Sequence, residues 1–314
     1  MCPACISSSA TLVAGALSAG GFVAFVATAL GGRLRTTASD PDGVTPETRS
    51  EDNMEGPAIA TRDEWLTARI ALLEKEKALT RARDALAAER RQLPMVKVEK
   101  SYVFDTPDGP RSLAELFEGR SQLVIYHFMF APEWIEGCPS CSLLCDHLDP
   151  TIVHLAHRDV TVAVVSRATL PDINRFKRRM GWQFTWVSSN RSDFNRDFHV
   201  SFTPEDVGQG RGIYNFRELG FPAEEAPGLS VFFKDSKGQV YHTYSTYARG
   251  GEPLMGVYTF LDLVPKGRDE DGLAFSMAWV RHHDRYDETY RVDPSRQYAQ
   301  PAAKTDCCDP RQPA

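Results

Sequence analysis

The sequence predicts an α/β protein with a mixed sheet flanked by helices. Between residues 94 and 268, short apolar runs typical of strands alternate with segments of helical periodicity. Two strand-like segments near residues 229–247 are separated by the turn sequence DSKG, which favours a terminal hairpin. The chain has 314 residues, 42% of them hydrophobic, and a net charge of -6. These values fit one soluble domain with extensions and exclude fibrous and collagenous classes.

The N-terminal residues 1–35 are predicted to form a transmembrane anchor. No charged residue occurs before Arg33, and residues 10–30 would reach about 31 Å as a helix, enough to span a bilayer. Arg33 and Arg35 follow directly, so the positive-inside rule places the rest of the chain in the cytoplasm. The alternative is a leader without a membrane role on a soluble cytoplasmic protein. Polar residues 36–60 have the composition of a flexible linker.

Residues 61–93 are predicted to form an N-terminal helix. Thr61 and Glu64 have the spacing of a capping box, and Pro94 ends the helix. Large apolar residues recur every seventh position, but the positions between them are mostly charged, so the apolar stripe is narrow. It favours a helix on the domain surface, or a short dimer contact, over a long coiled coil. The stripe consists of Trp65, Leu72, Leu79, Leu86 and Leu93.

The order of elements in the domain is read from hydrophobic period and from turn residues. The run at 123–130 is almost wholly apolar, as expected for a strand buried on both faces. Residues 269–314 are a C-terminal extension and tail. The predicted order is strand 96–104, a short helix from Ser112 to Gly119, strand 123–130, helix 139–157, strand 160–166, helix 170–180, strand 184–188, an irregular insertion 189–226, and strands 229–234 and 239–247.

The seven cysteines fall into three groups separated by long cysteine-free segments. A secreted disulfide framework would distribute them across the fold, so this grouping indicates metal binding or redox chemistry. Cys2 and Cys5 adjoin the predicted anchor, where acylation or metal binding is an option. Cys307 and Cys308 lie in the polar tail and either resolve a disulfide or have no role. The central group is Cys138, Cys141 and Cys145.

The central group has the form of a redox site. Cys138 and Cys141 are two residues apart at the start of a predicted helix, directly after a buried strand. The free N–H groups of a helix N-terminus stabilise a thiolate and lower its pKa. We therefore predict that Cys138 is the nucleophile and that Cys141 resolves the mixed disulfide. Cys145, one turn further along, is either a second resolving thiol or a buried small residue.

The cysteine motif is also compatible with metal binding instead of redox catalysis. Zinc sites use the same cysteine spacing, although the domain has no second such pair. His127, His147, His154 and His157 are close enough in sequence to complete a site. The alternative is thus a non-catalytic binding module with a metal-binding or structural cysteine cluster. For the redox function we expect no metal and no cofactor.

Several segments resemble known proteins. The run PGLSVFFKD at residues 227–235 resembles the thioredoxin segment in which a cis-proline faces the active-site cysteines, which makes Pro227 the cis-proline candidate. Residues 93–268 resemble the bacterial thioredoxin-like family catalogued as domain of unknown function 899. This resemblance implies a thioredoxin-like fold, without a settled activity. The matching runs are YHFMF (126–130), GCPSCS (137–142), MGW (180–182), WVSS (186–189), DFN (193–195) and HTYSTYARG (242–250).

The approach to the motif departs from ordinary thioredoxins. A longer loop, APEWIEG at residues 131–137, replaces their short approach and is a candidate pocket wall. The run FAP at residues 130–132 is loosely similar to peroxiredoxins, so a thiol peroxidase acting through Cys138 is an alternative. The threonine usual in peroxiredoxins before the cysteine is missing, which counts against it.

Accessory residues are predicted on one strand. His242, Tyr244 and Arg249, together with Tyr247, alternate along the last strand and either line a pocket beside the cysteines or form an outer face. His127 is a further accessory candidate. The run from His282 to Tyr286 is expected to be a solvated helix. No basic patch is present, which argues against nucleic acid. The expected partner is a protein or small molecule that carries a thiol or a disulfide.

Overall fold

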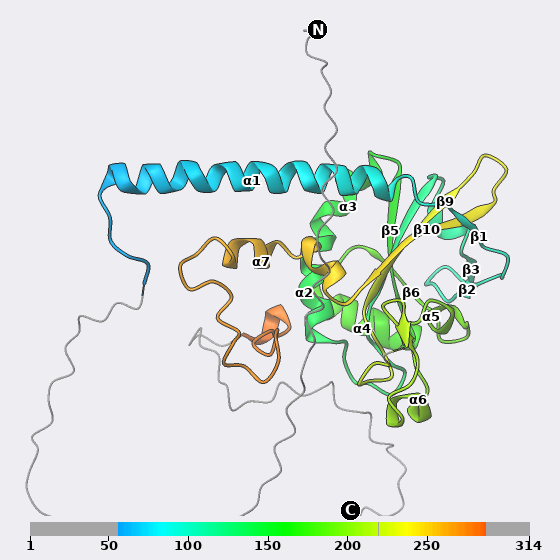
Figure 1. The fold of residues 1–314 in the computed structure, drawn as a ribbon. Coiled ribbons are helices and arrows are strands. Elements are labelled where there is room, and N and C mark those ends of the chain that lie inside the picture. The colour runs from blue at the N-terminus through cyan, green and yellow to red at the C-terminus, as the bar shows by residue number, and fades with distance from the viewer. Residues whose placement is uncertain (1–55, 219, 287–314) are drawn as a thin grey trace, which may run out of the picture. The chain divides into compact units, whose positions relative to one another are not determined.

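The computed structural model describes residues 56–218 and 220–286, and in them a mixed sheet of six strands is flanked by helices (Figure 1). Strands β4, β5 and β6 are parallel, whereas β9, β10 and β1 continue the sheet in antiparallel pairs. The predicted mixed α/β sheet with a terminal hairpin is therefore confirmed. In sheet order the strands are β1 (Val96–Lys97), β10 (Val240–Tyr247), β9 (Gly228–Lys234), β4 (Gln122–His127), β5 (Val160–Ser166) and β6 (Thr185–Ser188).

The central strands are buried on both faces, each against its own core. Successive side chains of a strand point to opposite faces. Tyr126 of β4 accordingly joins the core beneath α2 (Pro139–Leu148) and α4 (Leu170–Met180), while Ile125 joins the opposite core. That second core is closed by short elements: β2 (Val103–Phe104), β3 (Arg111–Ser112), η1 (Glu115–Phe117) and α5 (Phe194–Asp197).

Two predicted elements are divided in the structure. The helix expected at 139–157 breaks after α2 into η2 (Asp149–Thr151) and α3 (Ile152–Ala156). Pro150 lies at the break, where its missing N–H and its ring do not allow the helix to continue. The strand expected at 96–104 divides into β1, which pairs with β10, and β2, which pairs with β3.

Other elements agree with the prediction or are short. Strand β5 and helix α4 have the bounds that the sequence predicts, and Gly181 ends α4 in the left-handed conformation that glycine favours. The predicted insertion at 189–226 contains only short helices and strands joined by turns. The other elements are α6 (Pro204–Gly208), β7 (Ile213–Tyr214), β8 (Arg217–Glu218), η3 (Ala248–Leu254), α7 (Gly256–Leu261) and η4 (His283–Arg285).

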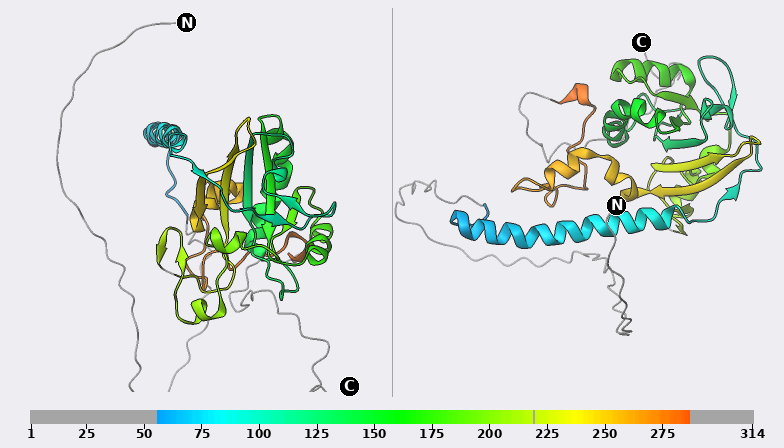
Figure 2. Two further views of the ribbon diagram at one scale, coloured as in Figure 1. Left: turned by 90° about the vertical axis from the view of Figure 1, so that its right-hand side faces the viewer. Right: turned by 90° about the horizontal axis from the view of Figure 1, so that it is seen from above.

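Helix α1 (Arg62–Arg90) begins at the predicted capping box. The Glu64 N–H donates to Thr61 Oγ1 at 3.3 Å, and the Thr61 N–H donates to Glu64 Oε2 at 2.9 Å. No residue of α1 is buried, and its apolar stripe stays exposed, with Trp65 at 48% and Leu79 at 62%. Figure 2 shows α1 as one continuous helix. The helix is therefore stabilised by its own backbone and cap rather than by a core.

None of the helices in the described part of the chain combines the length and apolar character needed to cross a bilayer. The predicted anchor at 1–35 lies outside the described residues, as does most of the predicted linker. The same holds for Cys2, Cys5, Cys307 and Cys308. Their predicted roles stay predictions.

Candidate active site

The loop between β4 and α2 places Cys138 at the start of a helix. The Cys138 N–H donates to the Met129 carbonyl at 3.1 Å, and the Ala168 N–H donates to the Phe130 carbonyl at 2.7 Å. Gly137 packs so closely that a Cβ there would lie 2.4 Å from Cε1 of Phe128, so only glycine fits. Cys138 is the N-cap of α2 and is partly exposed.

The surroundings of Cys138 favour its thiolate. Its pKa is lowered to about 7, chiefly because the Cys141 thiol hydrogen-bonds to its sulfur. The backbone N–H groups of Cys141 and Ser140 and the Ser140 hydroxyl add to this effect, which outweighs the opposing effect of desolvation. A large share of Cys138 is therefore ionised at neutral pH.

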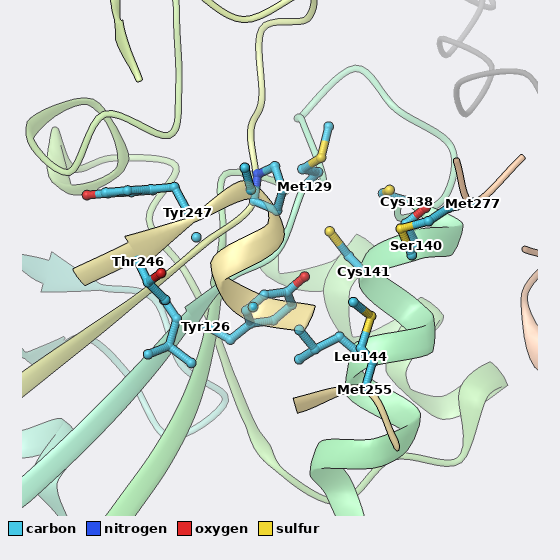
Figure 3. Close-up of a pocket in the computed structure, with 15 residues that line it drawn as sticks. Tyr126, Met129, Cys138, Ser140, Cys141, Leu144, Thr246, Tyr247, Met255 and Met277 are labelled. Atoms are coloured by element: carbon cyan, nitrogen blue, oxygen red, sulfur yellow. The ribbon is translucent and has the colours of Figure 1, made fainter. Parts of the chain in front are cut away.

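Cys141 is the opposite case. Its side chain is buried, with 2% of the residue exposed, and burial raises the pKa of its thiol well above the usual value. Two donors converge on its sulfur and partly offset burial, namely the Tyr126 hydroxyl and the Met129 N–H. Figure 3 shows the hydroxyl of Tyr126 directed toward the Cys141 sulfur. The pair thus contains one accessible thiolate and one sheltered thiol.

Tyr126 was not among the site residues predicted from the sequence. It lies inside an apolar strand, where a tyrosine ordinarily reads as a core residue. The sequence signal that could have identified Tyr126 as a site residue is its position in the strand that leads directly into the cysteine motif. Cys145 fits the second of its two predicted roles, that of a buried small residue. It is fully buried in the core beneath α2, and burial raises the pKa of its thiol. Unlike Cys138 and Cys141, it does not line the pocket at this site.

A cavity of about 90 Å³ opens beside the two cysteines. Pro227 lines it together with the start of β9, so this proline shares the cavity with Cys138 and Cys141. Its predicted cis bond is wrong, because every peptide bond in the described residues is trans. The lining residues are Tyr126, Met129, Cys138, Ser140, Cys141, Leu144, Pro227, Gly228, Leu229, Thr246, Tyr247, Ala248, Gly251, Met255 and Met277 (Figure 3).

Of the residues predicted to line a pocket from the last strand, His242, Tyr244 and Arg249 are not part of this cavity. The register of β10 shifts between His242, opposite Phe232, and Tyr244, opposite Val231. Because Phe232 and Val231 point to opposite faces, this bulge breaks the expected alternation. Tyr244 instead lies beneath the guanidinium of Arg90, 5.6 Å from its ring centroid.

Arg249 and Tyr247, near the end of β10, have different surroundings. Arg249 is exposed and forms an ion pair with Glu252 at 2.9 Å. Tyr247 does line the cavity, and its hydroxyl points away from the cysteines and donates to the Phe198 carbonyl at 3.1 Å (Figure 3).

His127 and His242 belong to a polar chain on the face of the sheet away from α2. His127 Nε2 contacts Ser230 Oγ at 2.9 Å, Ser230 Oγ contacts Ser245 Oγ at 2.8 Å, and Ser245 Oγ contacts His242 Nε2 at 2.7 Å. Burial lowers the pKa of His127 to about 3, so its ring is neutral. Strand alternation separates both histidines from the cysteines.

The described residues contain no group of three or more His, Cys, Asp or Glu side chains placed to hold a metal ion. His127 is across the sheet from the cysteines. His147 Nε2 accepts a hydrogen bond from the Val257 N–H at 3.1 Å. His154 and His157 are exposed on and just after α3. The histidines that could have completed a zinc site are therefore dispersed.

The C-terminal extension contributes to the site, which the sequence did not indicate. His282 Nε2 donates to the Gly137 carbonyl at 2.8 Å, and Arg179 Nη2 donates to His282 Nδ1 at 3.0 Å. The solvated helix expected at 282–286 agrees with the structure only in part: residues 283–286 are exposed and η4 covers His283–Arg285, whereas His282 is 4% exposed. Its ring packs edge-on against Phe176, with 5.2 Å between the ring centroids. The extension is thereby attached to the residue that precedes Cys138.

Comparison with known proteins gives one family match and several remote structural similarities. The model of the family described as bacterial protein of unknown function (DUF899) matches residues 54–286. No curated protein sequence matches the chain.

Three solved structures illustrate the remote similarities. A cysteine-to-serine mutant of peroxiredoxin Q from Xanthomonas campestris has 14% identity and a TM-score of 0.35, covering 50% of this chain and 90% of its own. Peroxidoxin BcpB from Mycobacterium tuberculosis has 13% identity and a TM-score of 0.36, covering 52% and 93%. A protein provisionally assigned as the thiol:disulfide interchange protein DsbE from Chlorobium tepidum has 13% identity and a TM-score of 0.32, covering 52% and 93%.

Proposed function

We propose that this chain, which belongs to the bacterial family of unknown function DUF899, is a thioredoxin-like thiol-disulfide oxidoreductase. The observation that carries the proposal is the asymmetry of the pair. Cys138 is partly exposed with a pKa lowered to about 7, whereas Cys141 is buried with a raised pKa. Thiol-disulfide exchange needs one accessible thiolate that attacks the substrate and a second, buried thiol that later resolves the mixed disulfide.

The reaction follows from this difference in two steps. The Cys138 thiolate attacks one sulfur of a substrate disulfide, forming a mixed disulfide and releasing the first substrate thiolate, which takes a proton. Cys141 then loses its proton and attacks the Cys138 sulfur, which forms the internal disulfide and releases the second substrate thiol. The substrate gains two electrons and the protein loses them. A thiol reductant returns the protein to the dithiol state.

Tyr126 and the Met129 N–H assist the second step. A buried thiolate without hydrogen bonds is costly, so Cys141 would be slow to ionise by itself. Both donors are already directed at its sulfur in the dithiol state. They stabilise the negative charge that develops there as Cys141 attacks.

A thiol peroxidase is the second candidate. The Cys138 thiolate would attack the outer oxygen of a hydroperoxide, release the alcohol and become a sulfenic acid, which Cys141 would convert to the disulfide with loss of water. A partly exposed cysteine with a low pKa supports this chemistry. No arginine lines the cavity, although an arginine is what activates the cysteine in peroxiredoxins. The exchange reaction is therefore the better supported.

The test compares single variants of the full chain in two assays, reduction of insulin disulfides by dithiothreitol and consumption of an alkyl hydroperoxide. Cys138→Ser should abolish the active reaction, and Cys141→Ser should trap a mixed disulfide that mass spectrometry detects on Cys138. Cys145→Ser serves as the matched control and should keep most activity. Equal activity of Cys138→Ser and the unmodified chain in both assays would overturn the proposal.

A further inference from the structure

Apart from the reacting Cys138 thiolate, the wall of the cavity carries no charged side chain. None of its fifteen lining residues is Asp, Glu, Lys, Arg or His. The two tyrosine hydroxyls in its wall are engaged, since Tyr126 donates to Cys141 and Tyr247 donates to the Phe198 carbonyl. A charged group placed there would lose water and find only the hydroxyls of Ser140 and Thr246, because the charge of Cys138 is itself lost when the mixed disulfide forms. The chemistry of the cavity therefore selects an uncharged, apolar group.

The volume of the cavity sets a second limit. About 90 Å³ is available. An apolar cavity of about 150 Å³ accommodates benzene. A short aliphatic group fits inside the smaller space, whereas a long chain or an aromatic ring would extend out of it into solvent. Met129, Met255 and Met277 form part of the wall, and methionine side chains adapt closely to small apolar ligands.

Met277 is the wall residue that the C-terminal extension supplies. Its φ is +70°, in the left-handed region that is strained for residues other than glycine. Glu270 holds it there, because Oε1 of Glu270 accepts hydrogen bonds from the Met277 N–H at 3.0 Å, from Trp279 Nε1 at 2.6 Å and from the Tyr258 hydroxyl at 2.8 Å. Figure 3 shows the Met277 side chain beside Cys138 and Ser140. Such a strained conformation persists only where its surroundings enforce it.

We infer that the substrate disulfide carries a short, uncharged aliphatic group on the sulfur that Cys138 attacks, and that Met277 limits the length of this group. The inference rests on the proposed function, because it concerns the sulfur that forms the mixed disulfide. In that intermediate the aliphatic group lies in the cavity while the first thiolate leaves toward solvent. Met277 is thus a specificity residue, and Glu270 is its positioning residue.

The test uses the reduced full chain and a set of S-alkyl methanethiosulfonates. The Cys138 thiolate displaces methanesulfinate and forms the Cys138–S–S–alkyl disulfide, so one reaction reports on the attacked group alone. The methyl, propyl and hexyl reagents vary length, and the 2-sulfonatoethyl and 2-(trimethylammonio)ethyl reagents carry opposite charges. After an acid quench, peptide mass spectrometry measures the loss of the free Cys138 thiol, counting both the alkyl disulfide and the internal disulfide that Cys141 forms from it. Each rate is divided by the rate of the same reagent with N-acetylcysteine, which removes intrinsic reactivity.

The normalised rate of the propyl reagent should exceed those of both charged reagents by tenfold or more, and the hexyl rate should be lower than the propyl rate. Met277→Ala should raise the hexyl rate relative to propyl several-fold, whereas Met277→Leu should keep the original order. Phe275→Ala is the matched control, because Phe275 lies in the same extension and is 54% exposed. Its order of rates should not change.

Three outcomes would count against these proposals, and each is distinguishable from the others. Equal normalised rates for all reagents, with Cys138 fully reactive, would overturn the substrate inference and leave the proposed exchange reaction standing. An order of rates that Met277→Ala and Met277→Leu both leave unchanged would remove Met277 from the specificity role. A Cys138 that reacts with none of the reagents would overturn the proposed function itself.

Discussion

At the scale of single residues, the site depends on the difference between two neighbouring thiols. Both come from one motif and one helix, yet the pKa of Cys138 is lowered and the pKa of Cys141 is raised. Cys138 is the partly exposed N-cap, and the Cys141 thiol donates to it. Cys141 is inside the core, where its charged form loses solvation. The roles proposed for the two thiols rest on these two environments, because the residue type is the same.

The pH dependence of Cys138 alkylation should report this difference. Its pKa of about 7 means that the thiolate fraction rises with pH up to about 7 and is nearly constant above about 8. The rate with iodoacetamide, a neutral reagent, should therefore rise about tenfold per pH unit below 7 and then level off. Mass spectrometry should find Cys141 unmodified over the same range. A midpoint of the rate profile at about 8.5, the pKa of an ordinary cysteine, would contradict the lowered pKa of Cys138.

Tyr126→Phe tests the hydrogen bond to the resolving thiol. Removal of the hydroxyl leaves one donor, the Met129 N–H, to stabilise the Cys141 thiolate. A hydrogen bond to a charged group contributes about 1.5–3 kcal/mol, so resolution should slow by roughly tenfold or more. The lifetime of the mixed disulfide on Cys138, measured after rapid quenching, reports that step.

The control for this measurement is Tyr102→Phe. Tyr102 is also buried, and its hydroxyl donates to Asp197 at 2.7 Å in the other core. Its removal should leave the lifetime unchanged. The same lifetime in Tyr126→Phe and the unmodified chain would show that Tyr126 has no part in resolution.

At the scale of elements, the C-terminal extension is connected to the loop that carries Cys138. Arg179 of α4 is at the centre, with hydrogen bonds to Glu136 at 2.6 Å, to Asp284 at 2.8 Å and to His282 at 3.0 Å. Arg179 lowers the pKa of Asp284 to about 2, so this carboxylate stays ionised in mild acid. The extension therefore supplies part of the wall of the cavity and part of the support of the loop that precedes Cys138.

His282→Ala should release the extension from the loop. The variant loses the hydrogen bond to Gly137 and leaves a hollow beside Phe176, at a cost of roughly 1–3 kcal/mol. Limited proteolysis should then cut within residues 269–286 faster than in the unmodified chain. His283→Ala is the control, since the His283 side chain is 43% exposed and contacts Asp146. Equal cutting rates in both variants would show that His282 does not hold the extension.

The same contact has a definite dependence on pH. Burial lowers the pKa of His282 below its usual value of 6.5, so the folded state binds fewer protons at this site than the unfolded state. Its contribution to stability is present above the usual pKa and decreases as the pH falls. Glu136, Asp284, Arg179 and Arg285 face or adjoin the ring, and the arginines oppose its protonation. Proteolysis of the extension should therefore accelerate in mild acid.

At the scale of the whole molecule, the cavity is assembled from segments far apart in the sequence. Its wall comes from β4 and the loop after it, from α2, from β9 and β10, and from residues 248–277. The sheet order places β9 beside β4, which brings Pro227 into the cavity that it shares with the cysteines. Helix α1 contributes no residue to this cavity and none to a core.

Removal of residues 1–93 should therefore leave the stability of the sheet domain nearly unchanged. A contact that is lost is Arg90 over Tyr244, and exposed cation–π contacts contribute about 0.5–1 kcal/mol. Urea unfolding followed by tryptophan fluorescence measures the change. The full-length reference carries Trp65→Phe, so that both chains report the same tryptophans. A loss of more than about 2 kcal/mol, well beyond one such contact, would indicate that α1 covers the domain or another copy of the chain.

Local patterns predicted the elements best. Strand β5, helix α4 with its glycine cap, and the capping box of α1 agree with the sequence-based predictions, because hydrophobic period and caps act over a few residues. Patterns that depend on neighbours were less informative. The bulge in β10, which appears only in the pairing with β9, placed Tyr244 on the face opposite to His242. The break of the long helix at Pro150 is different, because proline is a local signal that the prediction overlooked.

The sequence by itself determined the α/β class, the position of the cysteine motif at a helix start and the membership of the family, because these depend on local spacing and on matching runs of residues. Only the tertiary structure decided which residues surround the cysteines. Tyr126 and Met277 were missed, and His127, His242, Tyr244 and Arg249 lie elsewhere. The physical reason is that a side chain's neighbours are set by sheet order, register and the return of the C-terminal extension, none of which is encoded in the spacing of nearby residues.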